Sequence, residues 1–209
     1  MIDESIAREQ RPRGIARKAA FDLVLVLGTL FIVKSVLLRF DAFWTYAGPI
    51  SLLASVAVAT VCLRRNRERW ADLGLNRPTS ISKMLGWSIV TLVVTMVAGV
   101  VIEIAISSVG IERSVGVDPR YDSRFAALPG NTGVFAYWES VSWVVGAFAE
   151  EMLFRSMLFT RFERLFSGTP YPVLIAVALQ AIVFGQQHFY YQGWSGALAT
   201  GGFGSQVTA

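Results

Sequence analysis

Three charged side chains interrupt an apolar stretch of this sequence, and a histidine follows them. Glu150, Glu151 and Arg155 lie within residues 141–159, which are otherwise mostly apolar. His188 is the only histidine in the 209 residues. A carboxylate can take a proton from water while an imidazole orients or shares that water, so these residue types are suited to hydrolysis.

The spacing predicts that the carboxylate and the imidazole meet. Residues 167–170 read Ser-Gly-Thr-Pro, a turn signal between two apolar segments. Glu150 precedes Thr169 by 19 residues, and His188 follows it by 19. Two antiparallel helices that leave this turn at a rise of ~1.5 Å per residue would place both side chains at the same depth.

The elements that position these residues are long apolar blocks. The chain is 54% hydrophobic and 16% charged, against about 25% charged residues in a soluble domain. A membrane span needs about 20 mostly apolar residues. The expected spans are residues 20–38, 43–63, 84–109, 134–159 and beyond, and 171–188, with a sixth beginning at 194. The sequence therefore predicts an all-α, polytopic transmembrane helical bundle with five full spans and the start of a sixth.

Basic residues between these blocks predict the orientation. Thirteen Lys and Arg residues fall in the N-terminal tail, the second connection and the connection after the fourth span, and four fall on the opposite side. Lys and Arg favour the cytoplasmic side. We therefore expect a multi-pass protein of the plasma (inner) membrane, with a cytoplasmic N-terminus and an outward loop at 110–133. The net charge of +4 has this explanation, and no nucleic-acid partner is predicted.

The three charges on the fourth span allow two interpretations. Glu151 and Arg155 are four residues apart and are predicted to pair on one helix face. Glu150 is rotated by about 100° from Glu151 and is left to point into the bundle. A charge at the bilayer centre costs about 2.5–3.5 kcal/mol, so such residues usually serve a function. The alternative is an ion-pair cluster that only fixes helix packing.

These residues resemble a known family. Residues 150–155 read as an EExxxR motif, residues 184–188 as an FxxxH motif that begins at Phe184, and residues 72–78 as a DLGL…RP segment. The chain resembles the CPBP intramembrane proteases, also called the CAAX-processing or Abi family, which includes Ras-converting enzymes. The resemblance divides the chain into a basic tail (1–19), two N-terminal spans (20–69) and a protease-like membrane domain (70–209).

The resemblance implies roles for five residues. Glu150 would be the general base and His188 would hold the attacking water. Glu151 and Arg155 would support the site, and Phe184 would pack the motif helix. The substrate would be a membrane-embedded or membrane-anchored peptide within the lipid bilayer.

The chain departs from the family in one motif. The family has a later HxxxN or HxxxD motif, whereas this sequence has no second histidine. We therefore expect either a truncated member or a chain that has lost the activity. The rival functions are a non-catalytic binding or protective partner of another membrane protein and, ranked last, a transporter. No cofactor is predicted. Zinc would have only Glu150, Glu151 and His188 as ligand candidates, fewer His or Cys ligands than catalytic zinc normally takes.

The shared depth of Glu150 and His188 is testable by crosslinking. In a Cys62→Ser background, the pair Glu150→Cys and His188→Cys should react with a short bifunctional thiol reagent. The control pair Glu150→Cys and Leu174→Cys should not, because residue 174 lies much nearer the turn. Crosslinking confined to the control pair would contradict the hairpin argument.

Overall fold

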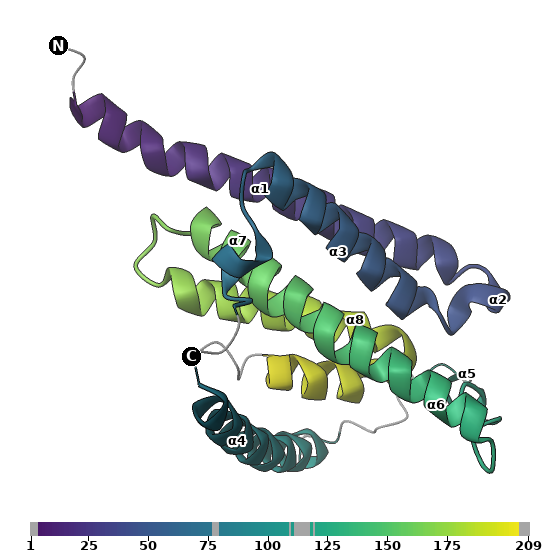
Figure 1. Ribbon diagram of the computed structural model, residues 1–209. Coiled ribbons are helices and arrows are strands. Elements are labelled where there is room, and N and C mark those ends of the chain that lie inside the picture. The colour runs from purple at the N-terminus through teal and green to yellow at the C-terminus, as the bar shows by residue number, and fades with distance from the viewer. Residues whose placement is uncertain (1–3, 77–79, 109, 111–117, 119, 205–209) are drawn as a thin grey trace. The chain divides into compact units, whose positions relative to one another are not determined.

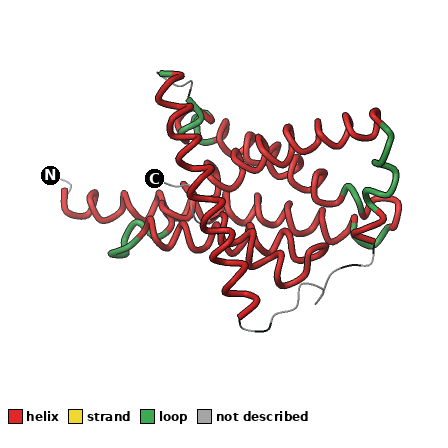
Figure 2. Tube along the Cα trace, turned by 90° about the horizontal axis from the view of Figure 1, so that it is seen from below, coloured by secondary structure: helices red, strands yellow, loops and turns green. Residues whose placement is uncertain are grey.

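The described part of the chain is helical. The computed structural model describes residues 4–76, 80–108, 110, 118 and 120–204. Within these residues there is no strand, and Figure 2 shows helices joined by loops. The all-α prediction is confirmed. The predicted end of the third span at residue 109 and much of the expected outward loop, residues 111–117 and 119, lie outside the described residues.

The described helices belong to two compact units, each made of two separate stretches of the chain. They are α1 (Glu4–Leu37), α2 (Asp41–Trp44), α3 (Ala47–Arg65), η1 (Trp70–Leu73), α4 (Ile81–Ser108), α5 (Arg120–Ser123), α6 (Thr132–Val141), η2 (Ser142–Ala149), η3 (Glu151–Leu158), α7 (Phe159–Leu165) and α8 (Pro172–Gly204). The first unit contains residues 1–75 and 135–176, and the second contains residues 76–134 and 177–209. The predicted boundaries at residues 19 and 69 stay predictions.

Four helices within the described residues are long and apolar enough to cross a membrane, where five full spans were expected. They are Gly14–Leu37, Ala47–Arg65, Ile81–Val101 and Pro172–Gly201. The last of these helices includes both the expected fifth span and the expected start of the sixth. Gly193, with a φ of 66°, breaks the helix between these two parts. The break falls immediately before residue 194, where the sixth segment was expected to begin.

The predicted fourth span differs in its helical geometry. The chain is helical from residue 132 to residue 165, but η2 and η3 within it are π-helical. π-Helical turns are rare, and they are frequent at functional sites. This stretch is not among the four apolar helices, and its charges at Glu150, Glu151 and Arg155 separate it from them in composition.

Small side chains line the contact face of α3 in the first unit. Figure 1 shows α1 and α3 side by side, and α3 also contacts η2 and η3. Ala47, Ser51, Ser55 and Ala59 recur every fourth residue on α3, and all four are fully buried. The Ser55 hydroxyl donates a hydrogen bond to the carbonyl of Ser51 (2.8 Å), so its burial leaves no polar group unsatisfied. Such small residues allow close helix packing in membranes.

The opposite surface of this helix pair is also apolar. On α1, Leu23, Val26 and Leu30 are buried, whereas Val24 is 70% exposed and Ile32 is 66% exposed. A helix that is hydrophobic on all sides is typical of a buried core or a membrane span. Since Val24 and Ile32 are not covered by protein, α1 has the surface expected of a helix that faces lipid.

A buried ionic network joins α1 and α7 to the loop after α3. The Arg161 side chain is only 1% exposed. Its Nε donates to Asp22 Oδ2 (2.8 Å), and its Nη2 donates to Glu68 Oε2 (2.6 Å). Asn66 Nδ2 also donates to Asp22 Oδ2 (2.8 Å), and Arg164 Nη1 donates to Glu68 Oε1. Removing one partner from a buried ion pair typically costs about 3–5 kcal/mol, so this network is important for the first unit.

The network predicts a loss of stability in acid. Burial alone raises the pKa of Glu68, but hydrogen bonds from Arg161 and Arg164 outweigh it, and the net pKa lies below its usual value. A carboxyl whose pKa is lowered by folding stabilises the protein above its unfolded pKa of about 4.3. That stabilisation is lost as the pH falls through the lower, folded-state pKa. Glu68→Gln should therefore lower the thermal unfolding midpoint near neutral pH and flatten its decline in acid.

The measurement is thermal unfolding of the purified chain in detergent from about pH 7 to about pH 3. Glu139→Gln is the control, because the exposed Glu139 carboxylate accepts a hydrogen bond from Trp143 Nε1 (2.9 Å) and lies outside the network. An equally steep acid decline in Glu68→Gln and in the unmodified chain would contradict the assignment.

Candidate functional site

The π-helical stretch of the first unit positions the acidic part of the candidate site. Arg155 Nη1 donates a hydrogen bond to Glu151 Oε1, which is the ion pair expected from their spacing. Both side chains are partly exposed, at 26% for Arg155 and 44% for Glu151. The pair therefore sits at the edge of the unit and not in its interior.

Glu150 is held differently from its neighbour. It is half-buried, and its charge interacts electrostatically with that of Arg155. Within the described residues, no ion pair to Glu150 is formed. The expected division between a paired Glu151 and an unpaired Glu150 is therefore observed.

The second unit holds His188 in a defined orientation. Its Nδ1 lies 3.0 Å from the carbonyl oxygen of Phe184. A carbonyl only accepts hydrogen bonds, so Nδ1 carries the hydrogen in this contact. The Phe184 ring meets the imidazole edge-on at 4.8 Å, so this residue contacts the histidine of its own motif. The same α8 turn thus supplies both a hydrogen bond and an aromatic wall.

Two further residues near His188 were not found from the sequence. The Tyr191 ring lies 5.6 Å from the imidazole, and the Arg124 guanidinium lies 5.7 Å from the Tyr191 ring. Tyr191 follows His188 by three residues and shares its helix face, which is a signal that could have been used. Arg124 lies in the expected outward loop at residues 110–133, and no local sequence pattern connects it with Tyr191.

Gly193 divides α8 into two arms, and a glycine inside the FxxxH motif of the first arm allows the second arm to pack against it. A Cβ atom built on Gly185 would lie 2.4 Å from the carbonyl oxygen of Ala197, which is closer than real Cβ contacts. The chain reverses at Gly193, whose φ of 66° suits glycine. Gly185 and Gly193 therefore explain how the second arm packs against the first. The spacing of the motif residues predicts neither the close approach at Gly185 nor the reversal at Gly193.

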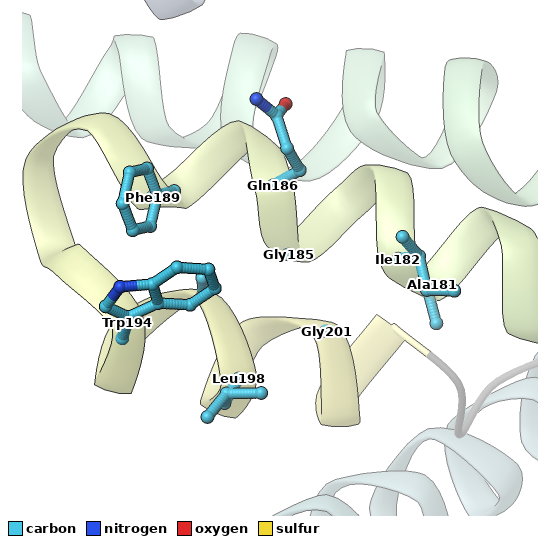
Figure 3. Close-up of a pocket in the computed structure, with 9 residues that line it drawn as sticks. Ala181, Ile182, Gly185, Gln186, Phe189, Trp194, Leu198 and Gly201 are labelled. Atoms are coloured by element: carbon cyan, nitrogen blue, oxygen red, sulfur yellow. The ribbon is translucent and has the colours of Figure 1, made fainter. Parts of the chain in front are cut away.

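An apolar cavity of about 470 Å³ lies between these arms. Its lining residues are Ala181, Ile182, Gly185, Gln186, Phe189, Trp194, Ala197, Leu198 and Gly201. Figure 3 shows the Phe189 and Trp194 rings next to the bend, where their centroids are 4.8 Å apart. Gln186 is the only lining residue with a polar functional group apart from the Trp194 indole, so the cavity is suited to an apolar group.

Glu150 and His188 belong to different units, and their predicted proximity stays a prediction. The metal candidates Glu150, Glu151 and His188 are divided in the same way. Among the described residues, no group of three or more His, Cys, Asp or Glu side chains is placed to bind a metal ion.

Comparison with known families identifies the segment that carries both motifs. Residues 132–208 match the model of a family described as Rce1-like, type II CAAX prenyl endopeptidases. This segment is therefore similar to the Rce1-like family. The Rce1-like segment covers EExxxR at 150–155 and FxxxH at 184–188, so the predicted family resemblance is confirmed. No curated protein and no solved structure matches the chain. Together with the apolar helices, the match of residues 132–208 indicates an integral membrane protein with a segment that is similar to a family of prenyl endopeptidases.

Substitutions of Arg155 and Glu150 should distinguish a residue that stabilises the fold from one that takes part in the reaction. Arg155→Ala removes the partner of Glu151, and a hydrogen bond between charged groups contributes about 1.5–3 kcal/mol. Thermal stability in detergent should therefore fall. Glu150→Gln keeps the side-chain volume and breaks no ion pair of the described residues, so the midpoint should stay near that of the unmodified chain. If Glu150→Gln were the more damaging change, Glu150 would be a structural residue.

Proposed function

We propose that this chain is an intramembrane endopeptidase that hydrolyses a peptide bond with glutamate-activated water. The observation that carries the proposal is the Rce1-like match across both motif-bearing segments. The state of the two residues supports it. Glu150 forms no ion pair within the described residues, and His188 is oriented by a backbone carbonyl and aromatic rings.

The proposed reaction assigns one proton transfer to each step. Glu150 takes a proton from a water molecule that His188 helps to hold, and the resulting hydroxide attacks the scissile carbonyl carbon. The tetrahedral intermediate then collapses, the C–N bond breaks, and the leaving amine receives the proton from Glu150. General acid–base catalysis of this kind contributes typically about 10²–10⁴-fold to the rate. Glu151, Arg155 and Phe184 act as positioning residues.

The proposed substrate is a peptide that is embedded in the membrane or anchored to it. The apolar cavity beside the FxxxH motif supports this choice, because it has room and chemistry for an apolar group. We further place the N-terminus in the cytoplasm and the protein in the plasma (inner) membrane, on the basis of the Lys and Arg distribution.

Cleavage assays test the proposal directly. In proteoliposomes, the chain extended with the last spans of an active relative should cleave members of a panel of prenylated and unmodified membrane peptides. The 209-residue chain alone should cleave them little, because it lacks the second histidine of the family's later motif. Glu150→Gln and His188→Ala should each lower the rate of the extended chain by about 10²-fold or more, as expected for groups in proton transfer. Glu139→Gln is the matched control on the same helical run, and it should retain the activity.

The alternative is a non-catalytic partner that binds or protects another membrane protein. Cleavage that survives Glu150→Gln would contradict the assigned base. Retained binding of the panel peptides without any cleavage by the extended chain, with or without Glu150→Gln, would favour the binding function.

A further inference from the structure

A polar cavity lies in the first unit, where the beginning of the apolar part of α1 approaches the loop after α3. Its volume is about 580 Å³. The lining residues are Arg17, Lys18, Phe21, Asp22, Arg65, Asn66 and Arg67. Four of these seven residues are cations and one is an acid, so the lining is strongly basic.

The single acid of this cavity is already neutralised. Asp22 accepts hydrogen bonds from Arg161 and Asn66, both at 2.8 Å. Within the described residues, none of the four lining cations forms an ion pair. The Arg65 guanidinium instead lies 4.8 Å above the Phe21 ring, which holds it at the cavity wall. The cavity therefore carries an uncompensated positive charge.

A second observation comes from the adjoining interior. A smaller cavity of about 140 Å³ shares Lys18, Asp22 and Asn66 with the first, and Arg161 also lines it. The Nη1 atom of Arg161 is buried and meets no acceptor within the described part of the chain. A buried guanidinium donor of this kind is stabilised by an acceptor oxygen. The lining cations and this donor therefore favour the same class of ligand, an oxyanion.

We propose that this cavity binds the phosphate-bearing headgroup of an anionic phospholipid. Guanidinium groups match phosphate oxygens through paired, charge-assisted hydrogen bonds. The cavity lies at the beginning of the candidate span Gly14–Leu37 and at the end of the candidate span Ala47–Arg65. Such a position corresponds to the depth of lipid headgroups, where basic pockets between helices bind anionic lipids. A soluble phosphate has the same oxyanion chemistry, but the position of the cavity at the ends of two candidate spans favours a lipid headgroup over it.

Lipid titration with matched variants tests the proposal. The purified full chain in nonionic detergent is titrated with short-chain phosphatidylglycerol, and the Kd is measured by native mass spectrometry. Arg65→Gln/Arg67→Gln removes two lining cations, and each contributes about fivefold to binding, so the Kd should rise about 25-fold. The control Arg64→Gln/Arg69→Gln removes the same charge from the same stretch, but neither residue lines the cavity. The control should change the Kd little, and an equal loss in both variants would overturn the site.

Three further measurements distinguish the ligand and the cause. Glycerol phosphate has the charge without acyl chains, and equally tight binding of it would overturn the lipid assignment. Equal affinity for short-chain phosphatidylcholine would overturn the role of charge. Arg65→Lys/Arg67→Lys keeps both charges and should retain most of the binding, whereas a loss as large as that of the Gln pair would refute electrostatic recognition. Unfolding midpoints of the lipid-free variants establish that each one is folded.

Discussion

The guanidinium group of Arg161 is almost completely buried, and the first unit depends on its neutralisation. Asp22 from α1 and Glu68 from the loop after α3 both accept its hydrogen bonds, which connects these segments to α7. An unpaired charge in such surroundings costs several kcal/mol, on the order of 3–5 when one partner of a buried pair is removed. The network therefore makes the position of α7, and of the helical run before it, depend on α1 and α3. Glu150 lies on that run.

The same constraint orders the charges of the candidate site. Glu151 and Arg155 neutralise each other on one face of η3, so Glu150 is not committed to an ion pair among the described residues. His188 is positioned by other means, because the carbonyl of Phe184 and neighbouring aromatic rings orient its imidazole. In the proposed reaction, Glu150 would take a proton from water that His188 helps to hold. The mutual neutralisation of Glu151 and Arg155 is consistent with a site in apolar surroundings.

Close backbone packing is the second structural requirement, and small residues meet it in both units. Membrane helices have no hydrophobic drive to associate, so they rely on tight contact and hydrogen bonds. In the first unit, the buried residues Ser51 and Ser55 lie in the contact face of α3. In the second unit, the second arm of α8 lies so close to Gly185 that a Cβ atom there would clash with its backbone. At Gly185 the requirement falls inside the FxxxH motif, so one short stretch serves both packing and the candidate chemistry.

The sequence by itself determined the helical class, four of the five expected apolar spans, the Glu151–Arg155 pair and the similarity of residues 132–208 to a prenyl endopeptidase family. These features are local, since they depend on composition, on runs of apolar residues or on spacing within a few residues. Only the tertiary structure decided that Arg161, counted as a basic residue of a connection, is buried beside Asp22. The two residues are 139 positions apart, and no local period connects them. The π-helical geometry around Glu150 and the contact of Arg124 with Tyr191 were equally unreadable, because backbone hydrogen-bond register and long-range contacts depend on how the helices pack.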